Sequence, residues 1–224
     1  IRLRDPMDLA GEFFSWEFAT AVAGSIMGIN PFDEPNVSES KENTRKILEE
    51  FQATGQMPLQ IEILEEEGIR LYGDPKTVLD GSIKKTFEAF LIQARPNDYL
   101  VLMAYLEPSR AHEALLQKVR HRIRDRYCIA TTLGYGPRFL HSTGQLHKGG
   151  AGNGLFLQVT ADDQEDIQIP GETYTFGNLK RAQALGDFYS LTSRRFRVLQ
   201  IHLGGHVEKD IKKLIQLIGI SQKI

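Results

Sequence analysis

Asp98-Tyr-Leu-Val-Leu-Met-Ala-Tyr-Leu106 is a continuous apolar run of strand length. A strand that is apolar on both sides is typical of a parallel sheet with helices on both of its faces. Three shorter apolar runs follow, at residues 129–133, 154–161 and 197–203, and helical patterns at 109–127, 175–192 and 207–218 separate or follow them. This alternation predicts a doubly wound, mainly parallel α/β sheet over residues 97–224.

The segments before residue 97 are less regular. Residues 8–30 are apolar nearly all round, which predicts a buried N-terminal helix. A second helix is expected at 37–53, and an amphipathic helix at 83–94. Residues 54–82 are polar and turn-rich, and fit either a helical hairpin or two short strands. We therefore expect a helical segment (1–53), a variable connecting region (54–96) and an α/β domain (97–224).

Composition excludes several classes of protein. The 224 residues carry 27 Lys and Arg against 29 Asp and Glu, a net charge of −2, which argues against a dedicated nucleic-acid binder. The apolar stretch 18–29 is shorter than the roughly 20 residues that a membrane helix needs. The single cysteine, Cys128, excludes an internal disulfide framework and fits the reducing cytoplasm. The chain begins Ile-Arg-Leu-Arg, with neither an initiating Met nor a signal core, so we expect a piece of a longer polypeptide.

The segment 131–150 has the composition of an anion-binding loop. It begins at the carboxyl end of a predicted parallel strand, where open α/β sheets place their ligands. Glycine N–H groups, hydroxyls and basic side chains together suit a phosphate. The residues expected to hold a sugar phosphate are Ser142, Thr143, Gly144, Gln145, His147 and Lys148. The alternative is that these polar groups cap a helix and bind no ligand.

Two other places could carry chemistry. The Pro- and Asn-rich loop 28–40 leads to Lys41 near the start of the next helix, where it is either a functional residue or a solvated lysine. His202 and His206 flank Gly204-Gly205 and are secondary candidates. His141 and His147 are poorly spaced for zinc, and Cys128 is distant, so we expect neither a metal nor a cofactor.

A family resemblance adds a specific expectation for Lys41. Trp16-Glu17-Phe18, followed by Gly28-Ile-Asn-Pro-Phe-Asp-Glu-Pro-Asn-Val-Ser-Glu-Ser-Lys41, resembles the C-terminal signature of glucose-6-phosphate isomerase. The family writes its core as Phe-Asp-Gln-x-Gly-Val-Glu-x-x-Lys. Phe32, Asp33, Val37 and Lys41 match it, whereas Glu34, Asn36 and Ser38 depart from it. The resemblance implies that Lys41 is catalytic in interconverting glucose 6-phosphate and fructose 6-phosphate.

The remainder resembles the tail of bacterial transaldolase/glucose-6-phosphate isomerase fusions. This likeness is carried by 130–150, by Pro170-Gly-Glu-Thr-Tyr-Thr-Phe-Gly177 and by Lys180-Arg-Ala-Gln-Ala-Leu-Gly-Asp187. It implies a sugar-isomerase (SIS-type) fold, a cytoplasmic role in glycolysis and gluconeogenesis, and an upstream isomerase domain of the same polypeptide as partner, and it allows a homodimer. The proton-shuttling glutamate and ring-opening histidine would lie upstream of residue 1. Transaldolase chemistry needs an eightfold barrel of about 250 residues, so that activity would reside outside this chain.

Three interpretations follow from these patterns. In the first, the chain supplies Lys41 to an isomerase site completed by residues outside it. In the second, it is a non-catalytic module that holds a sugar phosphate at 131–150, and in the third it is an interaction domain that joins the fused enzymes. The first predicts that Lys41 faces a shared cleft, the second that an anion binds only at the glycine-rich segment, and the third that both places stay empty.

Overall fold

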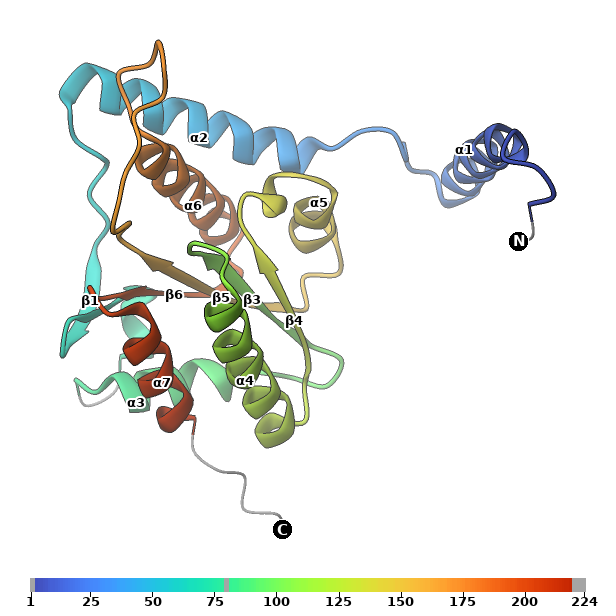
Figure 1. Ribbon diagram of the computed structural model, residues 1–224. Coiled ribbons are helices and arrows are strands. Elements are labelled where there is room, and N and C mark those ends of the chain that lie inside the picture. The colour runs from blue at the N-terminus through green and yellow to red at the C-terminus, as the bar shows by residue number, and fades with distance from the viewer. Residues whose placement is uncertain (1–2, 79–80, 219–224) are drawn as a thin grey trace. The chain divides into compact units, whose positions relative to one another are not determined.

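The computed structural model describes residues 3–78 and 81–218 (Figure 1). The chain divides into two compact units, Ile1–Pro35 and Asn36–Ile224. The helices are α1 (Asp8–Met27), α2 (Pro35–Thr54), α3 (Ile83–Leu91), α4 (Arg110–Tyr127), α5 (Ser142–Gly149), α6 (Phe176–Ser193) and α7 (Val207–Leu217). The strands are β1 (Glu62–Glu66), β2 (Ile69–Gly73), β3 (Tyr99–Tyr105), β4 (Ala130–Tyr135), β5 (Gly154–Ala161) and β6 (Arg197–Leu203).

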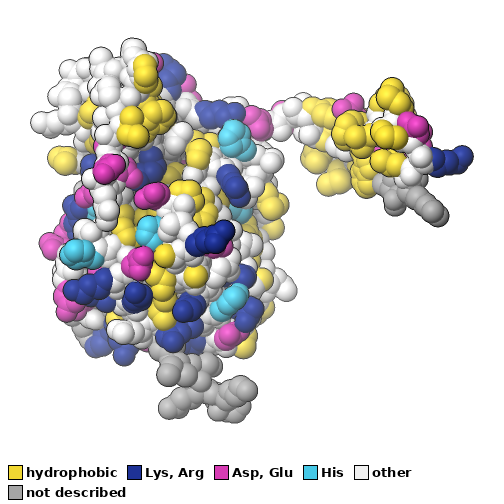
Figure 2. All heavy atoms as spheres, viewed as in Figure 1, with side chains coloured by type: hydrophobic (Ala, Val, Ile, Leu, Met, Phe, Trp, Pro, Cys, Tyr) yellow, Lys and Arg dark blue, Asp and Glu magenta, His cyan; other side chains and the backbone are white. Residues whose placement is uncertain are grey.

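The first unit consists mainly of α1, which ends at Met27, three residues before the predicted end at residue 30. Gly28 adopts a left-handed conformation with φ of 67°, and its N–H and that of Ile29 bond back to carbonyls in the last turn. The burial predicted for this helix is wrong. Phe14 is 68% exposed and Ile26 81% exposed, and Figure 2 shows apolar side chains over the surface of α1. A helix that is apolar on every side is expected to be buried, but the pattern does not identify which face packs or against which segment. The prediction that this helix is buried within the chain was therefore not constrained by the sequence.

The second unit contains one six-stranded sheet in the order β1-β2-β6-β5-β3-β4. The four strands β6, β5, β3 and β4 run parallel, as the alternation of strands and helices predicts. From β3 the chain passes to β4 on one side and then returns to place β5 on the other, which makes the fold doubly wound. The predicted fold class is therefore confirmed.

Residues 62–73 form the two short strands that were one alternative for this segment. β1 and β2 pair antiparallel, and β2 joins β6 antiparallel, so the hairpin extends the sheet beyond the parallel part. Consequently Arg70 pairs with His202 and Tyr72 with Gln200 near the carboxyl end of β6.

Helices cover both faces of the sheet (Figure 1). On one face, α3, α4 and α7 pack over the aliphatic side chains of β3, β5 and β6, and on the other α6 packs over Val101, Met103, Tyr105 and Phe156. Side chains of a strand alternate between its faces, so the apolar runs of the sequence supply both cores. None of the described helices combines the length and apolar character that crossing a membrane requires.

The helix α2 lies against α6 at a close contact. Ser40 Oγ donates to Ser190 Oγ at 3.2 Å, and Ile47 packs with Ala182 and Leu185. A Cβ on Gly186 would lie 2.7 Å from Thr44 Oγ1 and 3.0 Å from the Thr44 backbone N. Gly186 therefore lets the two helices approach closely, and α2 is held as a rigid part of the second unit.

Gly186→Ala tests this contact. Alanine in a helix interior ordinarily stabilises it by about 1 kcal/mol relative to glycine. Here we expect the free energy of unfolding, measured by urea titration, to fall by about 1–3 kcal/mol because the added methyl group meets the α2 backbone. Gly11→Ala, in an open position on α1, is the matched control and should not lower it. A Gly186→Ala protein as stable as the parent would contradict the packing described.

Candidate functional site

Polar side chains replace apolar ones on the α6-facing side of the sheet toward the carboxyl ends of β5 and β6. The strand register places Arg70, His202 and Thr160 in one row across β2, β6 and β5, and Tyr72, Gln200 and Gln158 in the next. Positions two apart on a strand share a face, so both rows point to the same side. This arrangement gives the sheet a polar floor where Val101 and Met103 continue the apolar core on β3.

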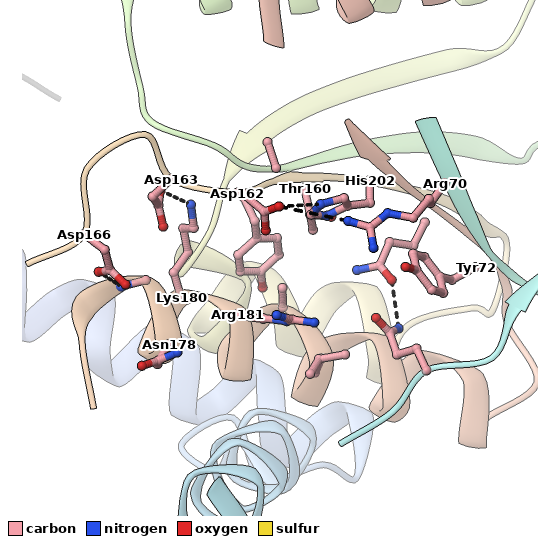
Figure 3. A pocket seen from close by; sticks show the side chains of 17 residues that line it. Arg70, Tyr72, Thr160, Asp162, Asp163, Asp166, Asn178, Lys180, Arg181 and His202 are labelled. Carbon is pink, nitrogen blue, oxygen red and sulfur yellow. Dashed lines mark hydrogen bonds and ion pairs between the residues drawn. The ribbon is translucent and has the colours of Figure 1, made fainter. Parts of the chain in front are cut away.

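Five of these six side chains, all except Gln158, line a cavity of about 220 Å³ (Figure 3). This is far more than the roughly 15 Å³ that one water needs, so the space suits a small organic molecule. The remaining walls come from Gln60, from the first half of α6 and from the loop after β5. The lining residues of these walls include Asp162, Asp163, Asp166, Asn178, Lys180 and Arg181.

Most charges around the cavity are paired within the protein. Asp163 forms an ion pair with Lys180. Asp166 accepts hydrogen bonds from Thr175 Oγ1 and from the Gly177 N–H, at the amino end of α6, and these bonds hold its pKa below the ordinary value against the opposing effect of desolvation. A carboxylate there also complements the helix dipole. The other charged side chains that line the cavity are Asp162, Arg70 and Arg181.

The two arginines differ in their partners. Arg70 Nη2 lies 4.0 Å from Asp162 Oδ2, and the Asp162 side chain is 75% exposed. Arg181 is exposed, and among the described residues it has no hydrogen bond or ion pair. Figure 3 shows Arg70 reaching over the cavity from β2 and Arg181 approaching from α6. A partly shared cation and an unpaired one therefore face the same space.

His202 provides a neutral group at the floor. Its Nδ1 lies 3.0 Å from Thr160 Oγ1, and its Nε2 is buried without a hydrogen bond to any described residue, 3.5 Å from Asp162 Oδ2. Burial lowers the pKa of His202, although Asp162 acts in the opposite direction. The ring is thus held uncharged, with one edge bonded to Thr160 and the other toward Asp162.

Hydrogen bonds between glutamine side chains fix the orientation of the second row. Gln158 Nε2 donates to the Ala184 carbonyl at 3.0 Å, Gln200 Nε2 donates to Gln158 Oε1 at 2.8 Å, and Gln60 Nε2 donates to Gln200 Oε1 at 2.8 Å. Each amide orients the next, so the direction of the whole chain is set by the helix carbonyl at its buried end. The chain ends at the side chain of Gln60, which lines the cavity.

A second hollow lies at the carboxyl ends of β3 and β5, beside the amino ends of α4 and α7. Its lining includes Ser109, His112, His206 and Lys209. Of the two secondary candidates from the sequence, His202 thus lines the polar cavity and His206 this second hollow. Within the described ranges, no group of three His, Cys, Asp or Glu side chains is arranged to hold a metal ion.

The structure places all of the predicted phosphate-binding residues on α5. Ser142 and Thr143 are exposed in its first turn. Gln145 Oε1 accepts from the Asn36 N–H at 3.0 Å and so caps the start of α2. A Cβ on Gly144 would lie 1.7 Å from the Phe139 carbonyl oxygen, which explains glycine there by packing alone. These contacts agree with the alternative of a capped, ligand-free segment, and phosphate binding at α5 stays a prediction.

Lys148 faces the protein interior rather than solvent. Its ammonium pairs with Asp187 of α6 and donates to the Phe139 carbonyl at 3.2 Å, and the side chains of Lys148 and Asp187 are 1% and 0% exposed. Tyr105 donates its hydroxyl to the other oxygen of Asp187 at 3.3 Å. Burial raises the pKa of Asp187, while the Lys148 ammonium opposes the shift. Lys148 thus joins α5 to α6 and β3, which is a structural role.

His147 is likewise buried, among the rings of Tyr99, Phe139 and Phe156, with centroid separations of 5.6–6.1 Å. Its Nδ1 has no hydrogen-bond partner in the part of the chain that the structure describes. Burial, with a smaller contribution from Lys148, lowers the pKa of His147 to about 4. The imidazole therefore acts as an uncharged aromatic side chain at neutral pH.

Lys41 lies in the second turn of α2 and is exposed. It lines neither the polar cavity nor the second hollow, and the structure does not bring it together with the α5 residues in either. The preceding residue, Ser40, is buried against α6. A packed helix thus presents Lys41 at the surface of the second unit.

Most residues of the cavity were not predicted from the sequence, although the sequence contains a pattern that indicates them. In Gln158-Val-Thr160 and Gln200-Ile-His202, polar and apolar residues alternate near the ends of two otherwise apolar strands. That pattern indicates one polar face, and its repetition in neighbouring strands indicates a shared site. Arg70 and Tyr72 repeat it in β2, but their pairing with β6 could not be inferred from spacing.

Comparisons with known proteins bear on the fold alone. No family model matches the chain, and no curated protein matches its sequence. A hypothetical protein from Thermus thermophilus has a similar structure, with a TM-score of 0.52 and 21% sequence identity. The match covers 64% of this chain and 40% of that one, so this chain corresponds to less than half of the Thermus protein.

Lys148→Ala distinguishes a structural lysine from one that binds a ligand. The substitution leaves the Asp187 carboxylate buried without its cation, so we expect the free energy of unfolding to fall by roughly 3–5 kcal/mol in urea titration. The double variant Lys148→Met with Asp187→Asn removes both charges and should recover at least half of that loss. Unchanged stability in Lys148→Ala would show that the ion pair does not support the fold.

His147 should make stability depend on pH. Its folded-state pKa of about 4 lies below the ordinary value of 6.5, so the unfolded chain binds the proton more readily between these pH values. Stability is therefore fully present above pH 6.5 and falls as pH drops toward 4, by up to roughly 3 kcal/mol. Unfolding titrations at several pH values should show a shallower decline for His147→Phe than for the parent.

The exposed His141 supplies the control for this measurement. His141→Gln should keep the parental decline. The same slope in His147→Phe and the parent would rule out His147 as its source.

Proposed function

We propose that this chain is the C-terminal part of an aldose–ketose isomerase that interconverts glucose 6-phosphate and fructose 6-phosphate, with Lys41 as its catalytic residue. The observation that carries the proposal is the presentation of Lys41. The residue that completes the Phe32-Asp33…Lys41 spacing is exposed on a helix whose buried side is fixed to α6 through Ser40 and Thr44. A rigid support of this kind is what a catalytic side chain requires.

The role of Lys41 follows from its chemistry. An ammonium group is a compact, charged hydrogen-bond donor, suited to the ring oxygen or a hydroxyl of the sugar as negative charge develops during ring opening. The proton transfer between C1 and C2 needs a base, and ring opening needs an acid. In this proposal both come from an upstream domain of the same polypeptide, so the chain alone would have little or no activity. The reaction would take place in the cytoplasm.

The second candidate is a non-catalytic module that binds a sugar phosphate or assembles the fused enzymes. The polar cavity favours this alternative, because it offers Arg70 and Arg181 to an anion without involving Lys41. An isomerase assay of residues 1–224, of the proposed upstream domain, and of the two together separates the two candidates. Activity that requires both parts supports the first candidate, and activity of the upstream part alone supports the second.

Lys41→Met, made in the polypeptide that includes the upstream domain, tests the assignment directly. We expect kcat for glucose 6-phosphate isomerisation to fall about 100-fold, the scale of losing one preorganised donor. Lys46→Met, on the same helix and also exposed, is the control and should leave kcat unchanged. Equal rates in the Lys41→Met and parent enzymes would remove Lys41 from the reaction.

A further inference from the structure

Burying the two rows of polar side chains beneath α6 costs free energy that an apolar core would not cost. Gln158 is 0% exposed and Gln200 3% exposed, on the face where the neighbouring strand β3 carries Val101 and Met103. Burying an amide costs free energy unless each of its groups finds a partner. Here three glutamines are aligned to satisfy one another, and the line leads to a cavity. A binding site explains this arrangement, whereas packing does not.

The charges indicate the first part of the ligand. Lys180 is neutralised by Asp163, and Asp166 is bound to the amino end of α6. Arg181 remains without a partner among the described residues, and Arg70 has only the distant, mostly exposed Asp162. Guanidinium groups bind planar or tetrahedral oxyanions through paired hydrogen bonds. The cavity therefore has a place for one anionic group, between β2 and α6.

The uncharged side chains that line the cavity indicate the second part of the ligand. Gln60, Tyr72 and His202 present an amide, a phenol and an imidazole to the same space. Partial burial raises the pKa of the Tyr72 hydroxyl, so it stays protonated and can donate. His202 Nε2 is buried, with no hydrogen bond to the residues that the structure describes and with the exposed Asp162 carboxylate 3.5 Å away. Groups that both donate and accept, spaced around a small cavity, suit several hydroxyls.

We propose that this cavity binds a small polyhydroxylated anion, a sugar phosphate or a sugar carboxylate, with its anionic group held by Arg70 and Arg181 and its hydroxyls by Gln60, Tyr72 and His202. The site shares no residue with Lys41 or α5. It therefore goes beyond the proposed isomerase function: if that function holds, the cavity is a second sugar-recognition site on the same chain, and if it fails, the cavity still binds its ligand.

Calorimetric titration of residues 1–224 tests the proposal with four probes: glucose 6-phosphate, gluconate, inorganic phosphate and glucose. We expect glucose 6-phosphate or gluconate to bind at millimolar concentration or below, at least tenfold more tightly than phosphate or glucose. The two hydroxylated anions distinguish a phosphate from a carboxylate ligand. No binding of either up to 10 mM, or equal binding of inorganic phosphate, would overturn the proposal.

Variants locate the site. Arg181→Gln removes an exposed side chain and should weaken binding about 10- to 100-fold, as expected for losing one charged donor. Arg70→Gln should have a similar effect, with an unchanged urea midpoint showing that the hairpin stays folded. Arg110→Gln, exposed at the start of α4 and outside the cavity, is the matched control. Parental affinity in Arg181→Gln would overturn the proposal.

Lys41→Met separates this proposal from the isomerase function. The Lys41→Met chain should bind with parental affinity, so a failure of the isomerase test would not count against the cavity. Amide chemical shifts provide the second readout. Perturbations around β2, β6 and α6 support the site, and perturbations confined to α5 would move the ligand there and overturn the assignment.

Discussion

Parallel pairing on both sides of β3 is the constraint on which the second unit depends. β3 pairs with β4 from Tyr99↔Ala130 onward and with β5 from Tyr99↔Gly154 onward, so all three strands begin in register. Each parallel connection needs a crossover, and the crossovers place α4 on one face and α6 on the other. The carboxyl ends then meet at one edge of the sheet. Both hollows described above lie there because the strand directions leave no other edge where loops and helix starts converge.

The same constraint explains where polar groups can be accommodated. A parallel strand is buried on both faces, so any polar side chain in it must find partners across the sheet or on the covering helix. Gln158 and Gln200 are adjacent in register and bond to each other, and Gln158 donates in turn to the Ala184 carbonyl of α6. Lys148 and Asp187 show the alternative arrangement, an ion pair that joins α5 to α6. One set of polar groups opens onto a cavity and the other is closed, which is why the first is the better candidate for recognition.

The sequence predicted elements better than relations between them. The strands β3, β5 and β6 follow from apolar runs, and α4 follows from the helical pattern at 109–127; in the structure Ser109 caps this helix by accepting from the His112 N–H. These are local properties. The predicted burial of α1 is wrong, because an apolar helix surface does not show which segment covers it. Phosphate binding in the segment 131–150 stays a prediction, because composition alone does not distinguish Gly, Ser and Lys that face a phosphate from those that face the protein, as Gly144 and Lys148 face the backbone carbonyl of Phe139.

The antiparallel addition of β2 to β6 determines the order in which the cavity can form during synthesis. Gln60 and Gln200, which bond across its edge, are 140 residues apart in the chain. Contacts between such distant segments form slowly because a long loop must close first. The β1–β2 hairpin is synthesised before β6, so its β2 edge is unpaired until β6 follows. A lone hairpin is only marginally stable in water. The part of the sheet that lines the cavity is therefore completed last, and a chain interrupted before β6 would keep an unpaired β2 edge open to other strands.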